Sequence, residues 1–515
     1  MPKASRRLGV LFLALTIGGA TGCATVPAPT PATLATAAPS AGGSQAAAPA
    51  LTPGANPTPI VLPTPPAPSL PPMEMRAVTP ATLPAPEGTV YLAPGPAGDV
   101  YLLVDAPRFS TDGPPSPPSR AVFTRLDSEG RTRPGWPVML EGWSCAWTNG
   151  MYRPFGPLVA PDGSIRAVCT SDGDAGDWGL VRAGVGLDGD GRPMAGWPVD
   201  LRTGGWDLQA VLDGETLVTS ASVQHSDQSG SKISYEFWVT TVSRDGTVNH
   251  GVRLATAGFA WDLLGTDGVT RIMEGDRGGL VTGLSGAGPV EGWPVTLGPR
   301  ISGPASGPGG TSYFAQVADG RTSTIVLGPD GARLDAGSDA PVAGQQSGEW
   351  TGAGPHGGPA VPLVAADGTV YLLEQGKTAV GAFGLDPTGA GLPGFPLDVP
   401  GQLETQGTCA RGETGCGVWV VRPTIGVDGT LYLPLRAPEA GSAGSLVAIA
   451  RSGSIVAGWP VALPGDGRAF WSVTTGADGT TYAVVAGDPG HPGAASVLAI
   501  GPDGRIRYEV PLVSG

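Results

Sequence analysis

The sequence predicts an all-β protein, a β-propeller of eight four-stranded blades with seven as the alternative count. Three observations support this prediction. A Gly-Trp-Pro or Gly-Phe-Pro motif recurs five times, with its glycines at Gly135, Gly196, Gly292, Gly394 and Gly458. Asp-Gly pairs before short β-like runs fill the wider gaps, which gives a unit of about fifty residues, typical of repeat architectures. The content of 84 Gly and 55 Pro, without a long 3.6-residue apolar period, argues against a helical solenoid.

The unit at residues 418–464 illustrates the four strands that we expect in each blade. An apolar run over 418–427 ends at Asp428-Gly429, and a β-branched and aromatic run follows over 430–435. Residues 445–450 then lead through Ser452-Gly453 into the run 454–463, which contains Gly-Trp-Pro. Asp-Gly between short apolar runs is a strong hairpin signal, because glycine accepts a positive φ without steric cost.

Such a unit cannot bury both of its faces alone, and radial repetition into a propeller solves this problem. A stack of β-sandwiches is the alternative fold. The motif Trp is expected near the end of the outer strand, wedged between neighbouring blades, with its Pro on an edge that needs no ladder donor. The expected blades cover residues 85–141, 155–201, 206–256, 259–298, 300–343, 358–400, 418–464 and 468–513 of a propeller over 85–515.

The repeats carry a family resemblance. The segment Asp367-Gly-Thr-Val-Tyr-Leu-Leu373 is similar to the repeats of quinoprotein-like (PQQ-like) propellers, and the Gly-Trp-Pro endings look like those of secreted bacterial propellers of the FG-GAP and quinoprotein-like groups. The resemblance covers residues from about 85 to 515. Its motifs are structural, so it implies the fold and says little about activity.

The N-terminus resembles that of a bacterial lipoprotein. A basic start with Lys3, Arg6 and Arg7 precedes an apolar segment over 8–20, too short for a comfortable membrane span. The small residues before Cys23 resemble a lipobox, which implies a signal peptide over 1–22 and lipidation of the Cys23 thiol. Ordinary secretion with an incidental Cys23 is the alternative.

Residues 23–84 are rich in Pro, Ala and Thr, and this composition predicts a disordered linker. One exception is the segment 73–78, which could pair with the last blade and help to close the ring. The chain would then be an exported propeller, lipid-anchored on the extracytoplasmic side of a bacterial cell membrane or outer membrane.

Four cysteines are left beside Cys23, an even number in a chain with an export signal. Cys409 and Cys416 bracket six residues inside one loop, so we expect them to pair locally. Cys145 and Cys169 then pair with each other, since both are expected on the same face of the propeller. Such a bridge stabilises a fold by about 3 kcal/mol on the chain-entropy model.

The two faces of the expected propeller differ in the length of their loops. The turns between the first two and the last two strands of a blade are short, whereas the other connections are long. We name the face of the short turns the turn face and the opposite one the long-loop face, where we expect binding. Exposed aromatic and charged residues suit contact with a sugar or a protein, unless they only anchor the loops. The candidates are Trp143, Trp147, Tyr152, Arg153, Trp178, Glu349, Trp350, His356, Arg411 and Glu413.

The sequence shows no catalytic set. The four histidines have no metal-ligand spacing, and Asp188-Gly-Asp190-Gly stands where the other blades have a plain turn, which disfavours calcium. The adjacent cysteine pair of quinoprotein alcohol dehydrogenases is missing, so neither PQQ nor a metal is predicted. A net charge of −14 without a basic run outside the signal excludes typical nucleic-acid binding.

These observations favour a monomeric, non-catalytic module that binds or scaffolds a protein or glycan of the cell envelope. The first alternative is a propeller enzyme, either quinone-dependent or active on polysaccharide, because propellers build active sites from residues scattered over several blades. The second alternative is a role in envelope assembly, resembling the propeller lipoprotein of the outer-membrane barrel-assembly machine.

Overall fold

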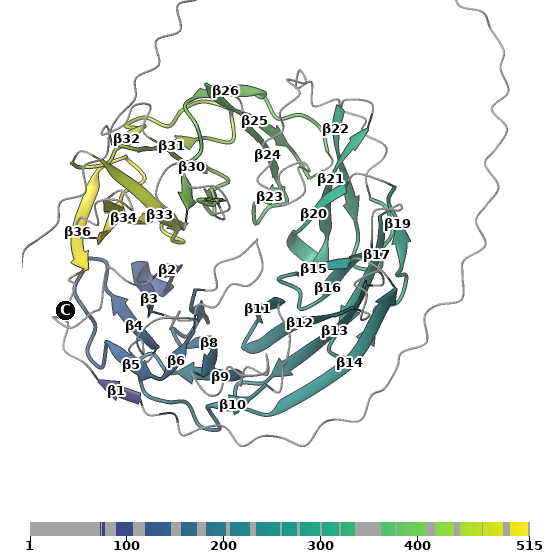
Figure 1. Ribbon diagram of the computed structural model, residues 1–515. Helices are drawn as coiled ribbons and strands as arrows, with labels where there is room; N and C mark the ends of the chain where they lie inside the picture. Colours follow the sequence, from purple (N-terminus) through teal and green to yellow (C-terminus); the bar gives the residue numbers. More distant parts are fainter. Residues whose placement is uncertain are drawn as a thin grey trace, which may run out of the picture. The chain divides into compact units, whose positions relative to one another are not determined.

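A computed structural model of the chain shows an all-β ring of eight blades, drawn in chain order from purple to yellow in Figure 1. The expected fold class is confirmed. The structure describes residues 73, 75–77 and 89–512, except 107–118, 146–155, 172–181, 202–206, 227–232, 258–259, 275–278, 299–300, 319–320, 335–361, 376–377, 388, 408–417, 437–442, 466 and 488–494.

The first four blades follow the order of the predicted units, with their strands antiparallel and the first strand innermost. Blade 1 has β2 (Thr89–Pro94), β3 (Val100–Ala106), β4 (Arg120–Leu126), β5 (Val138–Glu141) and an added β1 (Met75–Ala77). Blade 2 has β6 (Trp143–Ser144), β7 (Leu158–Val159), β8 (Ile165–Ser171), β9 (Arg182–Leu187) and β10 (Val199–Asp200). Blade 3 has β11 (Asp207–Asp213), β12 (Thr216–Ser226), β13 (Ile233–Val242) and β14 (Val248–Ala257). Blade 4 has β15 (Ala260–Leu264), β16 (Thr270–Glu274), β17 (Leu280–Ser285), β18 (Gly288–Pro289) and β19 (Val295–Thr296).

The other four blades complete the ring. Among its described residues blade 5 has β20 (Ile301–Ser306), β21 (Ser312–Ala318) and β22 (Arg321–Leu327). Blade 6 has β23 (Leu363–Val364), β24 (Val370–Gln375), β25 (Ala379–Leu385) and β26 (Leu397–Pro400), and a separate hairpin follows with β27 (Thr405–Gly407) and β28 (Val418–Val420). Blade 7 has β29 (Thr424–Ile425), β30 (Leu431–Leu435), β31 (Ser445–Ile449) and β32 (Val461–Ala462). Blade 8 has β33 (Arg468–Thr475), β34 (Thr481–Gly487), β35 (Ala495–Ile500) and β36 (Ile506–Leu512).

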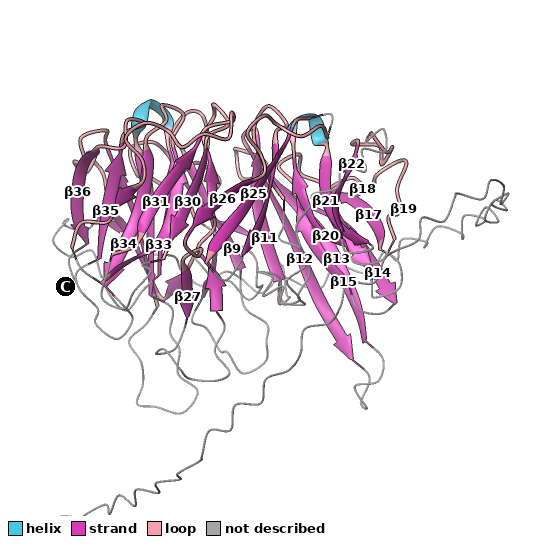
Figure 2. Ribbon diagram, turned by 90° about the horizontal axis from the view of Figure 1, so that it is seen from above, coloured by secondary structure: helices cyan, strands magenta, loops and turns pink. Residues whose placement is uncertain are grey.

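The short turns lie together on one face, as Figure 2 shows, with the 3-10 turns η2 (Pro96–Gly98) and η4 (Pro308–Gly310) among them. In several Asp-Gly pairs the Asp shapes the turn, because its carboxylate accepts a backbone N–H two residues further on. Asp162 accepts from Ser164 at 2.9 Å, and Asp367 accepts from Thr369 at the same distance. Local side-chain bonds of this kind explain why Asp and Gly mark these turns.

Three expectations need correction. The segment around β1 pairs with β5 of blade 1, Arg76 opposite Met139, and not with the last blade. The run 418–427 is not one strand: β28 ends at Val420 and β29 begins at Thr424, because Pro423 has no N–H for a ladder and restricts the residue before it. The connections between the second and third strands are also short in blades 4, 5 and 6, where they cover only 275–279, 319–320 and 376–378. The long connections of this class therefore occupy the arc from blade 7 through blade 1 to blade 3.

The Gly-Trp-Pro motif joins neighbouring blades through the outer turns. The buried Trp136 indole Nε1 donates to the Gly189 carbonyl of blade 2 at 3.1 Å. Four of the five motifs contain Trp, and each indole reaches the next blade in this way: Trp197 to Arg244, Trp293 to Pro329 and Trp459 to Pro502. The expectation of an aromatic wedge between blades is confirmed, with a hydrogen bond added to the packing.

A second set of inter-blade bonds runs closer to the centre. The third residue after the turn glycine is a Tyr in several blades, and its hydroxyl donates to a turn glycine of the next blade. Tyr101 bonds the Gly163 carbonyl at 2.6 Å, and Tyr371 bonds that of Gly429 at 2.6 Å. Tyr482 of blade 8 bonds Gly98 of blade 1 at 2.7 Å and thereby helps to close the ring.

Because of these tyrosines, we expect the folded propeller to lose stability at alkaline pH. Burial raises the pKa of Tyr101, Tyr371 and Tyr482 to about 12. A pKa that is higher in the folded state means that the unfolded chain loses its phenol protons first, so stability is complete below pH 10 and falls between about pH 10 and 12. Urea titrations across this range should show a falling midpoint. In the Tyr371→Phe variant the decline should be shallower, and an equal decline would contradict this assignment.

Candidate functional site

The strand ends that flank the long connections lie on the face opposite the short turns, which is the predicted long-loop face. Blade 3 extends furthest on this side, since β12 and β13 pair as far as Ser226 and Ile233 (Figure 2). Most predicted binding residues fall outside the described residues: Trp147, Tyr152, Arg153, Trp178, Glu349, Trp350, His356, Arg411 and Glu413. Cys23, Cys409 and Cys416 fall outside them as well.

Trp143 is described, and the structure corrects its expected exposure. It lies in β6 with only 2% of its surface exposed and belongs to the core shared by blades 1 and 2. Its side chain is therefore unavailable to a partner and anchors the connection that follows it.

The predicted bridge between Cys145 and Cys169 is confirmed. Cys145 directly follows β6, and Cys169 lies within β8, so the bridge holds both strands at the long-loop end of blade 2. Both cysteines are buried in the same core as Trp143. The disulfide thus fixes the chain at the point where residues 146–155 begin.

A buried carboxylate holds the same point from the neighbouring blade. Asp105, at the end of β3 and 1% exposed, accepts the Ser144 hydroxyl at 2.7 Å and the Cys145 backbone N–H at 2.7 Å. The two donors therefore tie the start of the 146–155 segment to blade 1.

The other end of this segment is also packed against blade 1. A Cβ at Gly156 would lie 3.3 Å from the Leu92 carbonyl oxygen of β2. The following β7 occupies the innermost position of blade 2 and contacts β2 and β11, the innermost strands on either side. The ten residues 146–155 are therefore an insertion into the innermost strand, and the residues that flank them are fixed near the centre of the ring. We name Ser144, Cys145, Cys169, Asp105 and Gly156 the insertion root.

Sequence reasoning missed the second set of inter-blade contacts, although the Tyr after the turn glycine recurs visibly. Blades 2 and 4 carry Arg at this position. Arg271 donates to the Gly310 carbonyl of blade 5 at 3.0 Å and so replaces Tyr. Arg166 is fully buried over the Trp197 ring at 5.2 Å, and burial lowers its pKa. Its Nε and Nη2 have no hydrogen-bond partner among the described residues.

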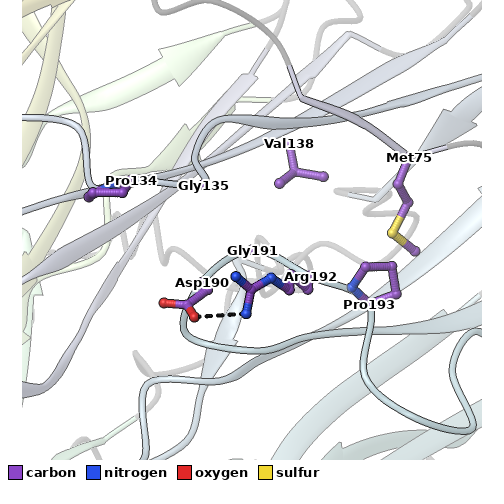
Figure 3. Close-up of a pocket in the computed structure, with 8 residues that line it drawn as sticks. All are labelled: Met75, Pro134, Gly135, Val138, Asp190, Gly191, Arg192 and Pro193. Atoms are coloured by element: carbon purple, nitrogen blue, oxygen red, sulfur yellow. Dashed lines mark hydrogen bonds and ion pairs between the residues drawn. The ribbon is translucent and has the colours of Figure 1, made fainter.

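A groove of about 420 Å³ lies at the outer rim between blades 1 and 2, far along the sheet from the insertion root (Figure 3). Its lining is mostly backbone, Pro and apolar side chains, with one exposed ion pair between Arg192 and Asp190 at 3.1 Å. Among the described residues no group of three His, Cys, Asp or Glu side chains is placed to hold a metal, and no helix could span a membrane.

Solved structures with propeller folds are similar to this chain at low identity. A puromycin hydrolase is 14% identical with a TM-score of 0.38, over 85% of this chain and 55% of its own. A prolyl endopeptidase is 12% identical with a TM-score of 0.39, over 78% and 55%. A quinonprotein alcohol dehydrogenase-like protein from Bacteroides thetaiotaomicron is 10% identical with a TM-score of 0.33, over 72% and 88%.

The chain spans about half the length of the two hydrolytic enzymes that it resembles. No family model and no curated protein sequence matches it. The class of protein is therefore defined by the strand pairing itself, as an eight-bladed β-propeller.

Proposed function

We propose that this protein is a lipid-anchored extracytoplasmic propeller that binds a protein or glycan of the cell envelope through its long-loop face. The insertion root carries this proposal. A disulfide, a buried carboxylate and close backbone packing together fix both ends of a ten-residue segment near the centre of the ring. Binding residues are typically placed on loops that a rigid scaffold positions.

The composition of the insertion suits recognition. Within ten residues it contains Trp147, Tyr152 and Arg153, and these residue types are enriched among the contacts that dominate binding energy. Aromatic rings also stack on the apolar faces of sugars. The turn face differs, because its repeated side chains form bonds between blades, such as those of Trp136 and Tyr101.

A defined panel tests this function. The purified propeller is applied to immobilised envelope oligosaccharides and to peptides from envelope proteins, and bound protein is quantified. The proposal expects saturable binding to one class of ligand. Binding to none of the panel, together with turnover in a polysaccharide-degradation assay or in dye reduction with PQQ and calcium, would favour the enzyme alternative instead.

Lipid anchoring is tested separately. Cys23→Ser removes the thiol that would be acylated, so the protein should move from the membrane fraction to the soluble fraction. A single acyl chain binds a membrane only weakly, and stable anchoring needs more than one. Fractionation of cells that express either form, with blotting of both fractions, measures the change. Retention of Cys23→Ser in the membrane fraction would contradict the anchor.

A further inference from the structure

The direction of β1 determines where the N-terminal segment leaves the ring. Met75 lies opposite Leu140, and Ala77 lies opposite Val138. Strand β5 runs from the Gly-Trp-Pro turn on the turn face toward the long-loop face, and β1 is antiparallel to it. The chain therefore enters β1 from the side of the long-loop face, at the outer rim of blade 1, where Figure 1 shows β1 outside β5.

Packing holds β1 in this place. Met73 and Met75 are partly buried against the core of blades 1 and 2. Met75 also lines the rim groove with Val138 of blade 1 and Pro193 of blade 2, as Figure 3 shows, so β1 lies along the seam between the two blades. The exposed pair of Arg76 and Glu141 is 3.8 Å apart, and pairs of this kind contribute little. The ladder and the two methionines therefore provide most of the attachment.

The alternative exit shows what this attachment achieves. Without β1, the first ordered strand would be β2, which begins at Thr89 on the long-loop side and is innermost in blade 1. The linker would then leave from the centre of the ring, next to the insertion root. Pairing with β5 moves the exit to the rim, four strand positions away in the sheet order β1-β5-β4-β3-β2.

We propose that β1 is a clasp that fixes the N-terminal tether at the rim of blade 1 and keeps it away from the insertion root near the centre of the ring. The clasp itself does not depend on lipidation, and only its purpose rests on the proposed function. Residues 24–72 remain as spacer, with a reach of roughly 150 Å when fully extended as polyproline II.

Trypsin reports directly on the clasp, because Arg76 is the sole Lys or Arg between residues 8 and 107. Cleavage after Arg76 is followed by mass spectrometry in the purified full chain and in a synthetic peptide of residues 70–82. A docked strand must open before it is cut, so we expect cleavage in the protein to be at least about ten-fold slower than in the peptide. Equal rates would overturn the proposal.

Two variants identify the contact that protects Arg76. Met75→Asp places a charge against the core and should bring the rate close to that of the peptide, while the melting temperature of the ring stays near that of the wild type. Glu141→Gln removes only the exposed pair and should change the rate less than about two-fold. A Met75→Asp protein that is still protected would show that β1 is not held as described.

Paired cysteines test the direction of the strand. Ala77→Cys with Val138→Cys should form a disulfide under oxidation, because these residues lie opposite each other. Met75→Cys with Val138→Cys should not, because Met75 lies opposite Leu140. The reverse result would place the exit on the turn face. All these measurements use purified protein without a membrane, whereas the Cys23→Ser test measures membrane association. A failure of the clasp is therefore distinguishable from a failure of the lipid anchor.

Discussion

Gly458→Ala is expected to destabilise the propeller by about 4 kcal/mol or more, the largest effect of any single methyl group that we predict. Gly458 precedes Trp459 in the last Gly-Trp-Pro motif and has a φ of 88°. A Cβ there would lie 2.2 Å from the Asp503 carbonyl oxygen, which belongs to the outer turn of blade 8. The backbone at Asp503 cannot move away without a large cost in free energy. Blades 7 and 8 would therefore separate at this turn.

Gly467→Ala is the matched control. Gly467 has a similar φ of 70°, but a Cβ there would meet no atom within 4 Å. The substitution should therefore cost only the strain of a positive φ, about 1–2 kcal/mol. Urea unfolding of both variants, followed by tryptophan fluorescence, measures the difference. Equal losses of stability in the two variants would mean that the close approach between blades 7 and 8 is not the reason why the motif requires glycine.

Removal of the disulfide by Cys145→Ala with Cys169→Ala should cost about 3–4 kcal/mol on the chain-entropy model. The two cysteines are separated by 24 residues in sequence, and the bridge closes that loop in the unfolded chain. Reduction of the wild-type protein should lower its melting temperature to a similar degree. A variant as stable as the oxidised protein would show that the bridge does not stabilise the ring.

The same variant separates stability from function. Asp105 still accepts the backbone N–H of residue 145 after the substitution, so one of the root contacts remains. If the insertion root positions the binding segment, affinity for a ligand should fall further in Asp105→Asn combined with the double substitution than in either alone. Unchanged affinity in the combined variant would place binding elsewhere.

The scaffold was predictable because its signals repeat. The Asp-Gly turns and Gly-Trp-Pro motifs predicted an eight-bladed propeller, and the strand pairing shows eight blades. Because the motifs repeat along the chain, one local exception such as Pro423 does not change the predicted fold. The pairing of Cys145 with Cys169 was predicted by elimination, because Cys409 and Cys416 were expected to pair locally, and the propeller topology allowed it.

The unrepeated features were harder to predict. Strand β1 has three residues, too few for an alternation pattern to select a partner, so its pairing with β5 depends on tertiary packing of Met75. Trp143 could not be distinguished from an exposed aromatic, because composition does not show which side of a connection faces the core. The split of the innermost strand of blade 2 around the insertion likewise has no local signal.

The central claim is that ligands bind at the insertion fixed by the root, and replacement of the insertion tests it most directly. Residues 146–155 are exchanged for a Gly-Ser segment of equal length, and affinity for the ligand identified in the panel is measured by calorimetry. The control is Ile455→Ala, an exposed apolar residue on the turn face. The account predicts at least about a hundred-fold loss for the replacement, the effect of about two strong contact residues, and no change for the control. Wild-type affinity in a folded replacement variant would contradict it.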